Sequence, residues 1–486
     1  MGYLVRSRVS KQSKIAVPRS RSSRVALAGL SDRSVSRFLV AVVLSVTNFV
    51  AVFDGIVVTV ALPSIQADLG LRQLDAQWLI TAYAVALGGM LLFGGRCGDR
   101  YGRRRILVIG LSLFVGGLLV AGGAWAPWLL FTARALQGLG AAFAIPNSFA
   151  IISALRPPDF RRRIFASVAV AGGLGAAGGA IIGGLMTEGL GWRFVFLLTA
   201  LVAGAAAVLA TKVLDGSACN SGPGRPDLVA AFLSLAGLGL LVLAITDIAR
   251  AGLLAPATMT AFILSVLFLV AFVVRERHSK APLVPSRILR DRALWAAVSG
   301  LPGVVFAYDG TAFIGPLFLQ QVAGFRPLET GLAFGPLGVA VLAGSPIAGF
   351  VLRRLHWSLV AAGAQLLCTA GLIFLQRAPG HAGYLTHVLP GLMLIGTGAA
   401  ISVIAFNSVA GSNARPTDHG GVYAVYETVK YLTGALAVAT LSTVAAGMGS
   451  LADGYGLAFT VSAVIAFTCG VAALIVGRLT RKDIRA

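Results

Sequence analysis

Long apolar runs alternate with short polar or basic segments along almost the whole chain. The first run covers residues 38–62, and later runs recur at similar spacing as far as residue 477. A helix needs about 20 apolar residues to cross the hydrocarbon core of a bilayer, and most of these runs approach or exceed that length. The pattern therefore predicts fourteen membrane-spanning helices. The first four are at residues 38–62, 77–93, 106–124 and 128–152, the fifth includes residues 171–184, and the sixth begins at residue 192. The other eight are at 228–248, 258–274, 294–318, 329–352, 357–375, 384–409, 419–445 and 456–477.

The composition indicates a polytopic membrane protein. Apolar residues make up 57% of the 486 residues, charged residues make up 12%, and the mean hydropathy is +0.86. On a soluble domain the net charge of +22 would suggest nucleic-acid binding. With both termini in the cytoplasm, however, most Lys and Arg fall in cytoplasmic segments, as the positive-inside rule demands. We expect an all-α multi-pass protein in a bacterial cytoplasmic membrane, with no nucleic-acid partner.

A basic, glycine-rich loop is expected at residues 94–105, between the second and third spans. It holds five arginines in twelve residues, which would keep it on the cytoplasmic side. The arginines could do no more than anchor the hairpin. The order Gly, two residues, small residue, Asp-Arg, any residue, Gly-Arg-Arg resembles the loop between helices 2 and 3 of the major facilitator superfamily, with Cys97 where that family usually has Leu. The resemblance implies a conformational switch formed by Gly95, Asp99, Arg100, Gly102 and Arg103.

Two charged residues lie deep within predicted spans and require compensation. Asp54 is in the outer half of the first span, and Arg134 is in the fourth. A charge at this depth costs about 2.5–3.5 kcal/mol on insertion scales, so we expect the two to pair. Residues 53–63 resemble the first-helix signature of the fourteen-helix drug:proton antiporters, and residues 134–142 resemble a second motif of that family. The resemblance implies proton coupling by Asp54 and Arg134, whereas a purely structural ion pair remains the alternative.

Small residues recur every fourth position in the fifth span. Gly175, Gly179 and Gly183 would form a flat face for close helix packing. The stretch stands where the antiporter family has its own motif, but Gly179-Ala180 replaces the family's Gly-Pro pair. Packing alone also accounts for the pattern.

The chain divides into two six-helix blocks with two inserted helices. We expect a basic cytoplasmic arm at 1–37, a first bundle at 38–213, a linker with two inserted helices at 214–292, a second bundle at 293–478 and a tail at 479–486. The two inserted helices are what distinguishes the fourteen-helix branch from twelve-helix relatives. The expected fold is thus the major facilitator fold with two six-helix bundles.

The second block carries three further charges within its spans. Glu427 and Lys430 are three residues apart on one helical face and can neutralise each other. Asp54 and Asp309 would then share Arg134, leaving one carboxylate in excess that can take up a proton. By resemblance, the helices that carry Asp54 and Asp309 line the central cavity, where these two residues and Gln137 would contact substrate.

The resemblance implies export of hydrophobic small molecules by proton exchange and alternating access. The sequence contains no nucleotide-binding loop of the Gly-x-x-x-x-Gly-Lys-Ser/Thr type, and its five His and four Cys lack metal-ligand spacing. We therefore expect no cofactor and no metal, a monomer, and a proton gradient as the energy source. The alternatives are a transporter of a specific metabolite, such as a siderophore, amino acid, peptide or lipid, and a non-transporting membrane sensor or enzyme.

Overall fold

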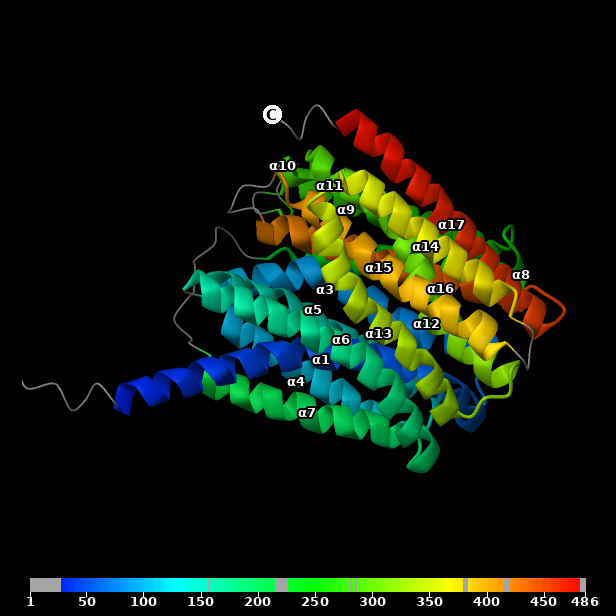
Figure 1. Ribbon diagram of the computed structural model, residues 1–486, viewed down its shortest axis with the longest axis horizontal. Helices are drawn as coiled ribbons and strands as arrows, with labels where there is room; N and C mark the ends of the chain where they lie inside the picture. The colour runs from blue at the N-terminus through cyan, green and yellow to red at the C-terminus, as the bar shows by residue number, and fades with distance from the viewer. Residues whose placement is uncertain are drawn as a thin grey trace, which may run out of the picture.

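The computed structural model describes residues 28–155, 157–214, 226–279, 282–284, 286–378, 383–413 and 419–480, and the regular secondary structure in these segments is entirely helical, without a β-strand (Figure 1). Fourteen helical segments within them are long and apolar enough to cross a membrane. The prediction of an all-α protein with fourteen spans is confirmed. The helices are α1 (Ala28–Leu69), α2 (Gln73–Ala76), α3 (Trp78–Tyr101), α4 (Arg103–Gly122), α5 (Pro127–Ala154), α6 (Pro158–Gly189), α7 (Trp192–Val213), α8 (Leu228–Ala251), α9 (Pro256–His278), α10 (Ser286–Leu289), α11 (Arg292–Val298), α12 (Leu301–Gln321), α13 (Pro327–Leu352), α14 (Trp357–Gln376), the π-helical turn η1 (Tyr384–Val388), α15 (Leu389–Ala410), α16 (His419–Ala446) and α17 (Leu451–Thr480).

The helices form two bundles that lie side by side. In the first bundle α1 packs on α6 and α7, and α5 packs on α3 and α4. In the second bundle α14 packs on α15 and α17, and α12 packs on α16 and α17. The first bundle lies below the second in the view of Figure 1. The inserted helix α8 packs against both α3 and α16, so it contacts one helix of each bundle.

The inserted helices are held together at the end where α8 begins. Asp227 caps α8 by accepting the backbone N–H groups of Val229 and Ala230, and it accepts a 2.8 Å hydrogen bond from Arg275 Nε at the end of α9. Burial alone would raise the pKa of the Asp227 carboxyl, but the Arg275 hydrogen bond and these two N–H groups bring it below its usual range. The carboxylate therefore stays ionised and stabilises the hairpin at neutral pH.

The first span is longer than the sequence predicts at both ends. Helix α1 begins at Ala28, inside the arm expected at 1–37, and it continues through Pro63 to Leu69 rather than ending at Leu62. A proline inside a helix removes one backbone hydrogen bond and kinks the helix without necessarily ending it. Leu62 and Ile65 on either side of Pro63 are fully buried, so packing holds the helix together across the proline.

The span expected at 294–318 is divided into α11 and α12, with a break at Ser299 and Gly300. Pro302 lies in the first turn of α12, and its missing N–H leaves the carbonyl of Val298 without the usual helical donor. Gly300 also lies directly against the Phe406 ring, where a Cβ would come within 2.0 Å of Cζ. The break thus brings α12 close to α15.

The small-residue face of α6 packs against α1. A Cβ on Gly175 would lie 2.9 Å from the carbonyl oxygen of Phe49, and a Cβ on Gly179 would lie 3.0 Å from that of Phe53. Gly183 packs in the same way against the next turn, at Val57. The structure therefore places the stripe against α1, where larger residues would force the two helices apart.

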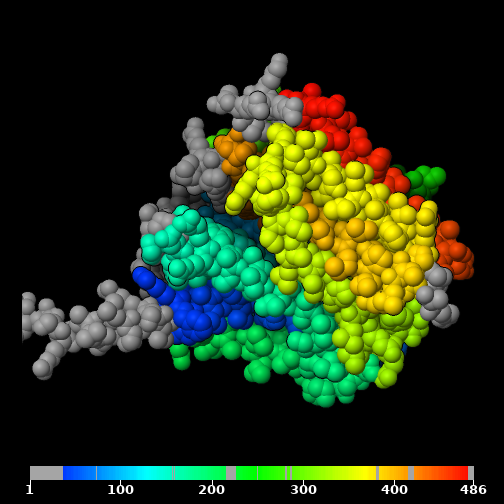
Figure 2. Space-filling model, viewed as in Figure 1, coloured from blue at the N-terminus to red at the C-terminus, as the bar shows by residue number. Residues whose placement is uncertain are grey.

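The two bundles are in contact toward one end of the molecule and separated at the other. Helix α6 packs on α13 from Gly173, which lies against Leu342, to Gly184, which lies against the Pro327 carbonyl. Toward the other end Figure 2 shows a hollow between the teal surface of α6 and the yellow-green surface of α13. That open end is the one at which α1 begins (Figure 1).

Candidate functional site

A buried ion pair joins α1 to α5. The Nη1 atom of Arg134 lies 2.5 Å from Oδ2 of Asp54, and the two side chains are 1% and 2% exposed. Arg134 also donates from Nε to the Leu79 carbonyl oxygen at 2.6 Å and from Nη1 to Oε1 of Gln137, and its guanidinium lies 4.7 Å from the Tyr83 ring centroid. Several groups thus hold the arginine, as a buried, permanently charged side chain requires.

Gln137 is left with half of its amide unused. Its Oε1 accepts from Arg134, but its Nε2 is buried without a hydrogen-bond partner among the described residues. A buried donor without a partner costs about 1–3 kcal/mol, so it is a group that a bound molecule can satisfy. The structure therefore places Asp54, Arg134 and Gln137 in one cluster with a free donor.

The sequence did not show that Tyr83 and the Leu79 carbonyl complete this cluster. They reach Arg134 because α5 crosses α3 very closely at Gly138, where a Cβ would lie only 2.3 Å from the Tyr83 carbonyl oxygen. Gly138, which follows Gln137, was the one sequence feature that pointed to this close contact, since a glycine in a span marks close helix packing. The sequence does not show which carbonyl Gly138 approaches, because that depends on how α5 crosses α3.

A second charged cluster lies in the other bundle. Lys430 on α16 forms an ion pair with Glu427 and lies with Nζ 4.9 Å from the Tyr431 ring centroid. Asp309 on α12 approaches the same helix at Gly434, where a Cβ would be 3.5 Å from its Oδ2. Glu427 and Lys430 both act electrostatically on Asp309. Three charges therefore gather where α12 and α16 meet.

This arrangement corrects the expectation that Asp54 and Asp309 share Arg134. Arg134 pairs with Asp54 inside the first bundle, whereas Asp309 belongs to the Lys430 cluster inside the second. The number of these charges was predicted correctly, but their distribution between the two bundles depends on which helices pack together. The excess acid is therefore in the second bundle, where Asp309 and Glu427 face one lysine.

Between the bundles the described side chains leave little free space. A cavity of about 10 Å³ is bordered by α1, α6, α12 and α13, with Thr59, Ala176, Tyr308 and Phe334 among its lining residues. That volume holds one water molecule at most. The described His, Cys, Asp and Glu side chains form no group of three that could bind a metal ion. A substrate at this level would therefore need the hollow on the open side to reach it.

The basic segment at residues 94–105 is a tight junction between two helices, so the prediction of a loop there is wrong. Helix α3 continues to Tyr101, α4 begins at Arg103, and Gly102 between them has a φ of 99°. This left-handed conformation favours glycine, so a single residue makes the turn. Gly95 and Asp99 thus lie on α3 rather than in a loop.

Charged contacts brace this junction. Arg103 lies 3.1 Å from Oδ1 of Asp99, one turn away, and donates to the Ala150 carbonyl on α5 at 3.0 Å. Arg100, in the last turn of α3, is exposed. The structure therefore brings Asp99 and Arg103 together, and it ties the α3–α4 junction to the end of α5.

Polar contacts that the sequence did not reveal join the bundles at the closed end. Glu188 at the end of α6 pairs with Arg326, and it accepts the Leu328 N–H at 3.1 Å. Gln321 donates to Gln66 at 3.0 Å, and Gln320 donates to the Val60 carbonyl at 3.0 Å. The partners are more than a hundred residues apart, so sequence spacing carries no signal for them.

Comparison with known proteins places the chain among transporters. Residues 44–438 match the Major Facilitator Superfamily. The chain is 37% identical to the puromycin resistance protein pur8 of Streptomyces alboniger, over 84% of this chain and 81% of that protein. It is 32% identical to the cephamycin export protein CmcT of Amycolatopsis lactamdurans, over 91% of this chain and 93% of that protein.

Solved structures support the fold. An auto-inhibited peptide transporter of the POT family superposes with a TM-score of 0.68 at 16% identity, covering 91% of this chain and 96% of that chain. The expected family and the expectation of a transporter rather than an enzyme are confirmed by the family match and by these relatives. The chain belongs to the Major Facilitator Superfamily.

Proposed function

We propose that this transporter exports hydrophobic small molecules from the bacterial cytoplasm in exchange for protons. The single observation that carries the proposal is the buried Asp54–Arg134 pair beside the unpaired Nε2 of Gln137. A carboxylate inside a membrane is the means by which a protein without a nucleotide site can use a proton gradient. Two relatives, a puromycin resistance protein and a cephamycin export protein, support antibiotics as the substrate class.

Protonation would change the Asp54 cluster in a defined way. A neutral Asp54 no longer balances Arg134, whose guanidinium then relies on the Leu79 carbonyl and Gln137. Because Asp54 is on α1 and Arg134 is on α5, weakening this bond frees the two helices to move relative to each other. One proton that crosses the membrane supplies about 2.3 kcal/mol per 100 mV, enough for roughly fiftyfold concentration of a neutral substrate.

Contact between the bundles at one end of the molecule, and a hollow between them at the other end, support alternating access. In the proposed topology both termini are cytoplasmic, so the hollow in Figure 2 opens to the cytoplasm and the contacts of Glu188 and Arg326 close the outer side. Substrate would enter the hollow, and proton uptake from outside would follow opening of the outer side. The Asp99–Arg103 junction lies at the open end and would form or release its ion pair as α3 and α4 shift. All of these groups belong to one chain, so a monomer suffices.

Proton-driven efflux in everted membrane vesicles tests the proposal. Asp54→Asn should abolish gradient-driven export of a lipophilic dye and leave dye binding to the detergent-solubilised protein measurable. The matched control is Asp68→Asn, which removes a carboxylate from the same helix where it is 46% exposed and paired with Arg193. Export by Asp54→Asn at the unmodified rate would refute proton coupling through Asp54, and loss of export in both variants would show a general effect of removing charge from α1.

A further inference from the structure

A cavity of about 510 Å³ lies between α1 and α6 at the open end of the molecule. It is separate from the two charged clusters and from the contacts at the closed end. Its volume is within the range of small-ligand sites, about 300–1,000 Å³. Along α1 the apolar residues begin directly after Arg37, and along α6 they begin directly after Arg163, and both arginines line the cavity. The cavity therefore lies at the boundary of the hydrocarbon layer, at the depth of lipid headgroups.

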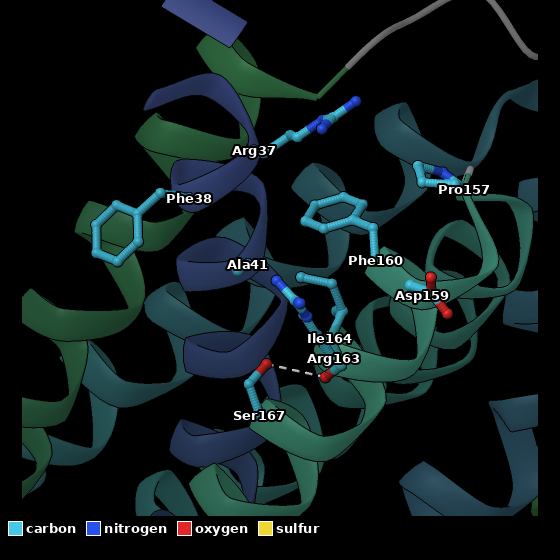
Figure 3. A pocket seen from close by; sticks show the side chains of 9 residues that line it. All are labelled: Arg37, Phe38, Ala41, Pro157, Asp159, Phe160, Arg163, Ile164 and Ser167. Atoms are coloured by element: carbon cyan, nitrogen blue, oxygen red, sulfur yellow. Dashed lines mark hydrogen bonds between the residues drawn. The ribbon is translucent and has the colours of Figure 1, made fainter. Parts of the chain in front are cut away.

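The mouth of this cavity is positively charged. Arg37 places its guanidinium 5.6 Å from the Phe160 ring centroid, and Figure 3 draws the nitrogen ends of Arg37 and Arg163 on either side of that ring. Asp159 also lines the cavity, but it is paired with Arg162. Two arginines thus face a cavity whose one carboxylate is already balanced.

The lining is mainly apolar toward the membrane interior. Ala41 lies one turn further along α1 than Arg37, and Ile164 lies one turn further along α6 than Phe160 (Figure 3). Ser167 ends the lining on α6, and its hydroxyl is already used, because it donates to the Ile164 carbonyl at 2.9 Å. Phe38 is 67% exposed at the same level, as aromatic residues at a membrane interface often are. Charged groups at the mouth and apolar groups behind them match a molecule with an anionic head and an apolar tail.

We propose that this cavity binds an anionic phospholipid of the cytoplasmic leaflet. The guanidinium groups of Arg37 and Arg163 attract the headgroup phosphodiester to this cavity, and the start of an acyl chain follows Ala41 and Ile164 between the helices. Basic pockets between membrane helices on the cytoplasmic side are suited to such headgroups. The two arginines beside an apolar lining favour a lipid over a soluble anion, because a soluble anion would leave the apolar part of the cavity unfilled.

Lipid retention on the purified, delipidated full-length protein tests this proposal by native mass spectrometry. Phosphatidylglycerol and phosphatidylcholine with identical acyl chains are titrated separately, and inorganic phosphate is the soluble-anion arm. The unmodified protein should bind phosphatidylglycerol in preference to phosphatidylcholine and should not exchange it for phosphate. Arg37→Gln/Arg163→Gln should weaken phosphatidylglycerol binding roughly twenty-five-fold, about fivefold for each arginine, and leave phosphatidylcholine unchanged.

The matched control is Arg353→Gln/Arg354→Gln, which removes two arginines at the end of α13. Arg354 also lies over an aromatic ring, 4.3 Å from the Phe350 centroid, but neither arginine lines the cavity. The control should change phosphatidylglycerol binding less than twofold, and Arg37→Lys/Arg163→Lys, which retains both charges, should keep most of the affinity. Equal losses in test and control variants, equal affinity for both lipids, or displacement of the lipid by phosphate would overturn the proposal. If the double glutamine variant aggregates, the two single variants decide it by the same fivefold criterion.

Discussion

Glu188 at the end of α6 and Arg326, the residue before α13, form an ion pair that joins the two bundles at their closed end. Glu188 also accepts the Leu328 N–H at the start of α13, so one carboxylate holds both the side chain and the backbone of the other bundle. Separation of the bundles at this end requires both contacts to break. The pair is therefore a latch that holds the two bundles together at this end.

Breaking this latch should favour the outward-open conformation. Arg326→Gln removes an ion pair whose arginine is exposed, and exposed pairs contribute up to about 1 kcal/mol, so the outward-open population should rise by up to roughly fivefold. The measurement is labelling of Thr59→Cys from outside the cell by an impermeant maleimide, in a chain whose four natural cysteines are replaced by alanine. Thr59 lines the small cavity between the bundles and is only 5% exposed in the closed arrangement.

Arg193→Gln is the control for the latch. It removes the pair between Arg193 on α7 and Asp68 on α1, which joins two helices of the same bundle at the same end. Labelling of Thr59→Cys should not change in this background. If Arg193→Gln increases labelling as much as Arg326→Gln does, the effect is general loosening and the latch is wrong.

Removing Arg134 should destabilise the protein more than removing Arg134 and Asp54 together. Arg134→Gln leaves a carboxylate that is 2% exposed without its cation, and loss of one partner of a buried pair costs about 3–5 kcal/mol. Asp54→Asn/Arg134→Gln leaves no uncompensated charge and should recover part of that loss. Melting temperatures of the purified variants in detergent provide the measurement. A double variant that melts as low as the sum of the single effects would contradict this account.

Asp309 should distinguish charged from neutral substrates. It lies near Lys430, which already pairs with Glu427, so the cluster carries one acid in excess that can attract a lipophilic cation. Asp309→Asn should therefore reduce export of a cationic dye by roughly tenfold, the scale of one charge-assisted hydrogen bond, and leave export of a neutral dye unchanged. Efflux of the two dyes from the same vesicles tests it, and equal losses would refute selection by charge.

Asp99 should affect the rate of transport and not the affinity for substrate. Its carboxylate contacts Arg103 across the Gly102 turn, away from the residues around Asp54 and Asp309. Asp99→Ala should slow efflux several-fold with an unchanged substrate dissociation constant, and Asp99→Asn, which keeps an acceptor for Arg103, should slow it less. Transport assays in vesicles and equilibrium binding to purified protein separate the two quantities. A matching loss of affinity would show that Asp99 acts on the substrate site.

The topology has a direct test with fusion reporters. Alkaline phosphatase fused after Arg103, or within residues 278–290, should be inactive because these positions follow an even number of spans from a cytoplasmic N-terminus. Fusion after Gly191, between α6 and α7, should be active. Activity at the first two positions would reverse the assigned orientation.

The sequence alone determined the number of spans and the family. Each span is a local property, because a helix in lipid must satisfy its own backbone hydrogen bonds and be apolar over a sufficient length. Short motifs around Asp54, Asp99 and Arg134 carried the family resemblance for the same reason, since their residues are consecutive or nearly so. The same local rules misplaced the end of α1 at Pro63 and missed the break at Gly300, where packing against other helices decides the outcome.

Only the tertiary structure decided where Asp309 belongs. The sequence predicted that Asp54 pairs with Arg134 and Glu427 with Lys430, and the structure contains both pairs, but only the approach of α12 to α16 places Asp309 in the second cluster. The Glu188–Arg326 latch and the cavity between Arg37 and Arg163 likewise join segments more than a hundred residues apart. Hydrophobic periodicity fixes which segments enter the membrane, whereas the relative positions of those segments depend on side-chain packing between helices.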